Sequence, residues 1–181
     1  MIPTVNQCLL FMEKYGMLEN IKAHSMVVEK VASVLARSLR QAGEDLVLEM
    51  VTAGALMHDI AKTECLRTKE DHAKKGKAIC LDHRLYEIAD IVAEHIVLAE
   101  FDSNHAVREK EIVYYADKRV NNDVVVSLEE RLEYLLDHYG GERESLKELI
   151  RENFKLCKAV EKKIFSRLSF QPQEVALLIN S

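Results

Sequence analysis

A histidine and an aspartate stand side by side, as His58-Asp59, within an otherwise apolar run from Leu56 to Ala61. An ionised carboxylate that is buried without a partner is very costly, so a buried pair of this kind requires a compensating cation. A metal ion is such a cation, since imidazole nitrogen and carboxylate oxygen are common metal ligands. The segment therefore indicates a metal site.

More candidate ligands lie in the apolar stripes of other predicted helices. His24 shares a stripe with Ile21 and Val28, and Asp117 takes the place of an apolar residue in a later stripe. Residues at this spacing share one face of a helix, so their polar members point towards the core. The inward-facing candidate ligands are His24, His58, Asp59, His72, His95 and Asp117.

Each of these residues has a simpler explanation when it is taken alone. A single histidine on an apolar face is usually a hydrogen-bonded core residue. Buried aspartates, however, are rare unless they are paired, and no inward-facing arginine is evident as a partner for Asp117. The coincidence of the candidate ligands favours a metal centre over a helical bundle without a site.

The elements that must position these ligands are predicted to be helices throughout. The chain has two prolines and six glycines, and apolar residues recur at helical spacing. We predict helices over residues 5–15, 18–41, 46–61, 71–81, 86–98, 106–120, 128–139 and 142–167, and a last one that begins at Pro172. Ser127 and Glu130 fit a capping box, and Gly140 is expected to end that helix. Gly76, one turn after His72, is expected to let a neighbouring helix come close.

The whole chain suits a single all-α domain over residues 1–181. Hydrophobic residues make up 48% of it and charged residues 30%, which is typical of a folded soluble protein. The net charge of −5 argues against a general binder of nucleic acid polymers or anionic membranes. The four cysteines are scattered, and no run has the length of a signal core or of the ~20 residues of a membrane span. We therefore expect a cytoplasmic protein with reduced thiols.

Five segments, in this order along the chain, resemble the motifs of the HD-domain metal-dependent phosphohydrolase superfamily. They are the first histidine at His24, an HDIG-type segment at His58–Lys62 with Ala61 at the glycine position, an HAxxG-like segment at His72–Gly76, a histidine motif at Ile91–His95, and an ADK motif at Ala116–Lys118. The resemblance covers roughly residues 20–120. It implies an HD-domain-like helical bundle, with a core at about 18–122 and extra C-terminal helices at about 127–181.

The same resemblance implies roles for individual residues. It implies that one metal ion is bound by His24, His58, Asp59 and Asp117. In extended members His72 and His95 complete a second site, and Asp59 bridges the two ions. Lys62 would contact a substrate phosphate. The deoxynucleoside 5′-monophosphatase branch has a glutamate at the position of Lys62. The pattern is more similar to the branch that hydrolyses symmetrical dinucleoside tetraphosphates and to the cyclic-dinucleotide phosphodiesterases, although the large partner domains of the latter are not seen in this sequence.

The expected chemistry is hydrolysis of a phosphoester or phosphoanhydride bond in a small nucleotide-type substrate. The ligand set suits one or two ions of Mn, Fe, Co, Ni or Zn. Metal-bound hydroxide would attack phosphorus, with Asp59 as the central catalytic ligand. Lys62 would neutralise charge on the phosphate oxygens, with Lys118 or Arg119 adding to this effect.

Two other functions are open at this point. Six nitrogen and oxygen ligands could hold two irons for an oxygenase reaction on the same fold. A nucleotide-binding signalling module without turnover is the other alternative. The amphipathic C-terminal helices suit a homodimer as well as the core of a monomer.

Overall fold

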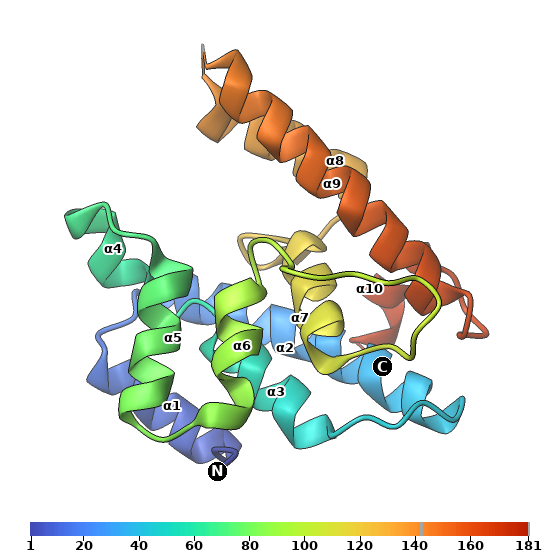
Figure 1. The fold of residues 1–181 in the computed structure, drawn as a ribbon, viewed down its shortest axis with the longest axis horizontal. Helices are drawn as coiled ribbons and strands as arrows, with labels where there is room; N and C mark the ends of the chain where they lie inside the picture. The colour runs from blue at the N-terminus through green and yellow to red at the C-terminus, as the bar shows by residue number, and fades with distance from the viewer. Residues whose placement is uncertain (142, 181) are drawn as a thin grey trace.

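The computed structural model describes residues 1–141 and 143–180, and this part of the chain is a bundle of helices (Figure 1). The α-helices are α1 (Val5–Lys14), α2 (Glu19–Gln41), α3 (Leu48–Met57), α4 (Lys62–Thr68), α5 (His72–Asp82), α6 (Tyr86–Glu94), α7 (Glu109–Lys118), α8 (Leu128–Leu135), α9 (Glu144–Phe165) and α10 (Val175–Leu178). A π-helical turn, η1 (Leu136–Gly140), follows α8, and a 3₁₀ turn, η2 (Pro172–Glu174), precedes α10. The predicted all-α class is confirmed.

A short hairpin of two strands is the described exception to the helical structure. β1 (Val120–Asn121) pairs antiparallel with β2 (Val124–Val125), with Val120 opposite Val125. The turn between them places Asn122 at a φ of 53°, a left-handed conformation that asparagine tolerates better than most residues. The hairpin follows α7 directly, so it lies beside the end of the helix that carries Asp117.

Several predicted helices are shorter in the structure than the sequence pattern indicates. The predicted helix 46–61 ends at Met57, and α4 begins anew at Lys62. Between them the backbone makes tighter turns, because the Ile60 N–H donates to Met57 O and the Lys62 N–H donates to Asp59 O. The predicted helix 86–98 ends at Glu94, and the predicted start of another at Glu142 lies outside the described residues.

α2 is the central helix of the body. Its 23 residues pack against α3 and α7, and its apolar stripe is buried from Ile21 to Leu39. α5 and α6 pair with each other, and α6 also packs against α3 (Figure 1). No helix in the described ranges is long and apolar enough to cross a membrane.

Two glycines allow α6 to approach its neighbours closely. A Cβ atom on Gly54 of α3 would lie 2.5 Å from Ile91 Cγ2, and one on Gly76 of α5 would lie 2.7 Å from Val92 Cγ1. Both distances are well inside van der Waals contact. The expectation that Gly76 lets a helix come close is confirmed, and the contact holds the ends of α3, α5 and α6 together.

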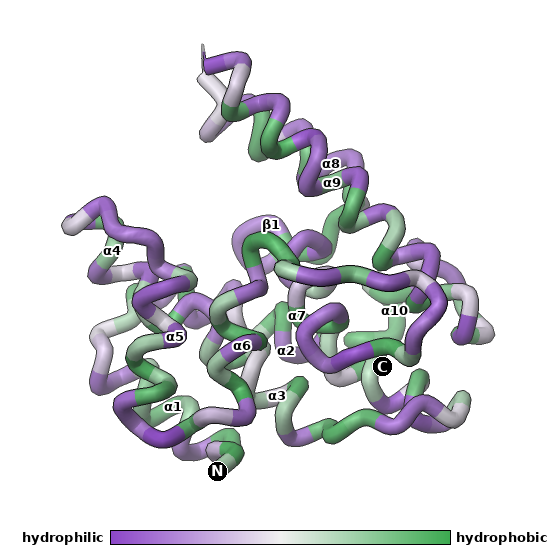
Figure 2. The backbone as a smooth tube through the Cα atoms, in the orientation of Figure 1, coloured by the Kyte–Doolittle hydropathy of each residue, from purple (hydrophilic) through white to green (hydrophobic). Residues whose placement is uncertain are grey.

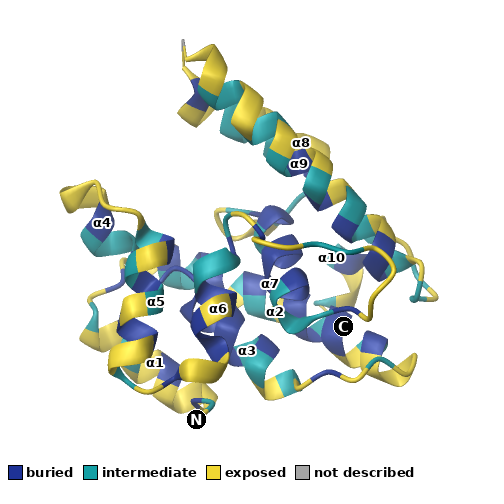
Figure 3. Cartoon of the chain, in the orientation of Figure 1, coloured by how far each residue is buried: buried dark blue, intermediate teal, exposed yellow. Residues whose placement is uncertain are grey.

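The C-terminal helices form a hairpin that reaches out from the body (Figure 1). α8 and η1 pair with α9, and α9 also packs against α7. The buried residues of α9 lie from Phe154 onwards and include Val160. Figure 3 shows mostly exposed and intermediate residues towards the free end of this hairpin. Figure 2 shows hydrophobic and hydrophilic residues alternating along α9, as in an amphipathic helix. The predicted capping box of Ser127 and Glu130 is present at the start of α8.

The close approach of α3 and α6 predicts the effect of adding one methyl group. Overpacking of a core lowers the free energy of unfolding by about 1–3 kcal/mol. The higher helix propensity of alanine offsets up to about 1 kcal/mol of this loss. We therefore expect Gly54→Ala to lower the free energy of unfolding by roughly 1 kcal/mol, measured by urea denaturation. In an Ile91→Ala background, where Cγ2 is gone and Cβ remains at 3.2 Å, the same substitution should destabilise less. A neutral or stabilising effect in the wild-type background would contradict this packing.

Candidate metal centre

The six candidate ligands come together from five helices of the body. His24 lies within α2, His58 and Asp59 follow α3, His72 begins α5, His95 follows α6, and Asp117 lies near the end of α7. The cluster is buried, with His58 at 0% exposure and Asp59 at 1%. Helices that are far apart in the sequence therefore bring their polar residues to one point.

One half of the cluster surrounds the His58 imidazole. His58 Nε2 lies 3.4 Å from Asp59 Oδ2 and 3.6 Å from Asp117 Oδ1. Asp117 Oδ1 also lies 3.0 Å from His24 Nε2. Ligand atoms of His24, His58 and Asp59 all lie within 4.8 Å of one another, which is close enough for one ion to bind them.

The other half of the cluster surrounds the second oxygen of Asp59. Asp59 Oδ1 lies 3.1 Å from His72 Nε2 and 3.5 Å from His95 Nε2. Ligand atoms of these three residues also lie within 4.8 Å of one another. Asp59 therefore belongs to both halves, the arrangement that a bridging carboxylate requires.

Backbone carbonyls orient three of the histidines. The Nδ1 atoms of His24, His58 and His95 lie 2.8, 2.7 and 2.7 Å from the carbonyl oxygens of Asn122, Ala55 and Val92. A carbonyl accepts a hydrogen bond, so each Nδ1 carries the proton and donates it. The Nε2 atom is then left as an acceptor that points into the cluster, which is the tautomer a metal ligand needs.

Two buried atoms in the cluster have no hydrogen-bond partner in the described part of the chain. They are His58 Nε2 and Asp59 Oδ1, one from each half. A buried polar atom without a partner costs about 1–3 kcal/mol, so native structures rarely keep one without a reason. A divalent ion at each half would satisfy both atoms, and the donor set of imidazoles and carboxylates fits such an ion.

Each of the two carboxylates is paired with a lysine. Lys62 Nζ donates to Asp59 Oδ2 at 2.7 Å, and Lys118 Nζ donates to Asp117 Oδ2 at 3.1 Å. Lys118 also donates to His95 O and lies over the ring of Tyr114. In both aspartates Oδ2 pairs with a lysine and Oδ1 lies near histidines, and Oδ2 of Asp59 lies near His58 as well.

The electrostatics of the cluster keep both aspartates ionised and His95 neutral. Burial alone would lower the pKa of His58, but the carboxylates of Asp59 and Asp117 raise it. Burial alone would raise the pKa of Asp59, but the charges of His58 and Lys62 hold it well below its usual value. Burial lowers the pKa of His95 to about 4, so this imidazole is neutral near pH 7. The pKa of Asp117 is also well below its usual value, because Lys118 and His24 outweigh its burial.

Arg119 is the sequence-predicted site residue that the structure does not bring to the cluster. Its guanidinium donates to Val126 O at 2.6 Å, to Pro172 O at 3.0 Å and to Tyr115 Oη. These bonds tie α7 to the end of the β-hairpin and to η2. Arg119 therefore holds the C-terminal segment in place, and we do not include it among the phosphate contacts.

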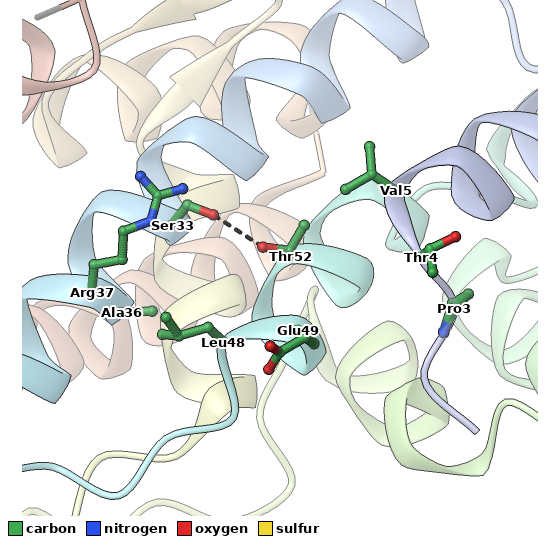
Figure 4. Close-up of a pocket in the computed structure, with 9 residues that line it drawn as sticks. All are labelled: Pro3, Thr4, Val5, Ser33, Ala36, Arg37, Leu48, Glu49 and Thr52. Carbon is green, nitrogen blue, oxygen red and sulfur yellow. Dashed lines mark hydrogen bonds between the residues drawn. The ribbon is translucent and has the colours of Figure 1, made fainter.

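A cavity of about 540 Å³ opens beside the cluster. Its polar lining includes Asp59, Lys62, His72, His95, Asp117 and Lys118. A smaller cavity of about 270 Å³ lies between the start of α1 and helices α2 and α3, where Ser33 and Thr52 are joined by a hydrogen bond (Figure 4). The larger cavity is the one that a substrate would enter to reach the candidate ligands.

The residues that complete this cavity are not among those predicted from the sequence. Arg131 of α8 lines it, together with apolar residues of η1 and α9 such as Tyr139 and Leu149. Their sequence signal is an ordinary amphipathic pattern, which does not distinguish a cavity wall from a solvent-exposed face.

Comparison with known proteins identifies the family. Residues 21–122, more than half of the chain, match the HD domain family, so the protein belongs to that family. Members of this family are generally metal-dependent phosphohydrolases that bind divalent metal ions. No curated protein and no solved structure matches the chain. The match contains all six candidate ligands and ends before α8.

The bridging position of Asp59 predicts the effect of removing it. We expect about one or two transition-metal ions per chain in the reconstituted wild type, measured by elemental analysis, and a loss of this metal in Asp59→Ala. Chelation should lower the Tm of the wild type but not of the variant, since an ion at about 100 times its Kd contributes about 2.7 kcal/mol of stability.

Asp90→Ala is the matched control for this experiment, because Asp90 is an exposed aspartate of α6 paired with Lys77. It should retain the metal and the response to chelation. Equal metal content in wild type and Asp59→Ala would contradict the assignment.

Proposed function

We propose that the protein is a metal-dependent phosphohydrolase that cleaves a phosphoester or phosphoanhydride bond of a small nucleotide-type substrate, with dinucleoside tetraphosphates favoured. One observation carries this proposal. The cavity is lined by candidate metal ligands and also by two lysines, Lys62 and Lys118. Ligands for a cation and fixed positive charges beside them suit a substrate that is negatively charged where it reacts.

A bound divalent ion lowers the pKa of coordinated water, and so supplies a hydroxide nucleophile near neutral pH. The protein's own residues prepare this site. Backbone carbonyls orient the imidazoles of His24, His58 and His95. Asp59 presents one oxygen to each half of the cluster. Mn, Fe, Co, Ni and Zn all suit the ligands, as one or two ions.

Lys62 is the residue best placed to contact the transferred phosphate. Its side chain is about one-third exposed, so the ammonium group can reach a bound molecule while it remains paired with Asp59. Lys118 is nearly buried and held by Asp117, so it adds fixed positive charge rather than a mobile contact. Positive charge at these positions stabilises the negative charge that builds up on phosphate oxygens as the bond breaks.

The dimensions of the cavity support an organic phosphate as the substrate. A volume of about 540 Å³ is far larger than inorganic phosphate requires, and it lies in the range typical of sites for small organic ligands. The net charge of −5 gives no support for a nucleic acid polymer as substrate. A nucleotide, or one half of a dinucleotide, fits both observations.

A substrate screen tests this proposal. The reconstituted protein should hydrolyse at least one member of a panel of nucleoside phosphates and dinucleoside polyphosphates, with Mn²⁺ and in the absence of oxygen. Lys62→Gln should lower kcat/KM by about 10²-fold, because one charged contact to the developing anion is lost. Lys74→Gln, which changes an exposed lysine of α5, should leave the rate unchanged.

Two results would contradict the proposal. Turnover that requires oxygen would indicate an oxygenase, and tight nucleotide binding without any cleavage would indicate a signalling module. Phosphate release and oxygen consumption, measured in parallel, separate the three functions.

A further inference from the structure

The cavity beside the metal cluster has a second wall that lies outside the HD family match. It is built by α8, η1 and α9, which follow residue 122. The apolar residues of this wall are Leu135, Tyr139, Leu146, Leu149, Ile150 and Phe154. The family core thus supplies the ionic side of the cavity, and the C-terminal hairpin supplies an apolar side.

Several large apolar side chains at this cavity are exposed to solvent. Leu149 is 68% exposed and Tyr139 56%, and Leu66 and Val97 on the body are more than half exposed as well. Exposed apolar side chains are ordinary when they are scattered, but a group that lines one hollow marks a binding site. The hollow has ionic groups at one side, so its ligand should be anionic at one end and apolar at the other.

Arg131 adds an unusual positive charge to this wall. It makes no ion pair with any residue of the described ranges, and its one hydrogen bond there runs from Nη1 to Asn121 Oδ1 at 2.8 Å. Its Nε atom is buried and has no partner in the same part of the chain. Lys62 and Lys118, in contrast, are each paired with an aspartate.

An arginine without a carboxylate partner is suited to an anion that comes from outside the protein. The guanidinium offers several donors in a fixed plane and binds phosphate through two of them at once. The bond to Asn121 holds the side chain against the β-hairpin, where Asn122 O also accepts the hydrogen bond of His24. Arg131 is therefore anchored beside the metal cluster but does not belong to it.

We propose that α8, η1 and α9 form a distal subsite for the part of the substrate that is remote from the scissile phosphate. Arg131 binds a second phosphate group, and the wall around Tyr139 and Leu149 holds a nucleobase. The aromatic ring of Tyr139 favours a flat base, since stacking on an aromatic side chain is a common way to bind any base. This inference rests on the proposed function and names the substrate class as nucleotides with at least two phosphates.

Equilibrium binding to the metal-reconstituted protein tests the subsite without requiring turnover. The probes are adenosine 5′-diphosphate, adenosine 5′-monophosphate, inorganic pyrophosphate and geranyl diphosphate, titrated by calorimetry. Wild type should bind adenosine 5′-diphosphate at least about tenfold more tightly than pyrophosphate, because only the nucleotide can use the apolar wall.

Substitutions in the wall separate its two parts. Arg131→Gln should weaken both adenosine 5′-diphosphate and pyrophosphate by about tenfold and leave the monophosphate unchanged, because a charged contact to the second phosphate is lost. Leu149→Asn should weaken the nucleotide about threefold without changing pyrophosphate, because apolar contact area is lost. Metal content should equal that of wild type in both variants.

The controls are exposed residues that lie outside the lining of the cavity. Arg151→Gln changes an arginine of α9 that pairs with Glu144, and Leu177→Asn changes a leucine of α10 that is 74% exposed. Both variants should bind every probe as wild type does.

Three results would overturn the inference. They are unchanged diphosphate binding in Arg131→Gln, an equal loss for the monophosphate, and tighter binding of geranyl diphosphate than of adenosine 5′-diphosphate. The last result would assign the wall to a hydrocarbon chain. If the proposed hydrolase activity is wrong, the wild type will show no turnover. The binding measurements would still test the subsite in that case.

Discussion

The carboxylate of Asp59 is the group on which the centre depends. It is 1% exposed, and its two oxygens face different partners: Oδ2 approaches Lys62 and His58, whereas Oδ1 approaches His72 and His95. A buried carboxylate is stable only where positive charge compensates it. The short turn after α3, the close contact of α3 with α6 at Gly54 and the start of α5 at His72 all serve to build that environment. Several elements of the fold therefore meet around the carboxylate of Asp59.

Much of this centre could be predicted from the sequence, because its ligands lie in local patterns. Each polar residue interrupts an apolar stripe of helical period, and this pattern identified His24 and Asp117. The break after Met57 was missed, since no glycine or proline marks it. Arg119 has a partner 53 positions away, at Pro172. Contacts between segments so distant in sequence leave no local pattern. The position of Arg131 in the same cavity as Asp59 and Lys62 likewise has no local sequence signal.

In the proposed hydrolase, two regions of the chain carry different parts of the site. Residues 21–122, which match the family, carry the ligands and the lysines, while the α8–α9 hairpin carries the apolar wall and Arg131. In a site of this kind, substitutions in the apolar wall can change the substrate preference while the metal ligands stay the same. The tight hydrogen bonds of Arg119 to Val126 and Pro172 keep the C-terminal segment fixed relative to α7. The wall therefore has a firm base, even though its free end reaches into solvent.

The most direct test of this account is anomalous diffraction from crystals of the metal-reconstituted protein, recorded at the absorption edge of the metal. We expect an anomalous peak within coordination distance of Asp59 Oδ1 or Oδ2 and of the Nε2 atom of His58 or His95. A second peak on the other side of Asp59 would show that the carboxylate bridges two ions. The absence of any peak at this cluster, or a peak bound by other residues, would contradict the central role of Asp59.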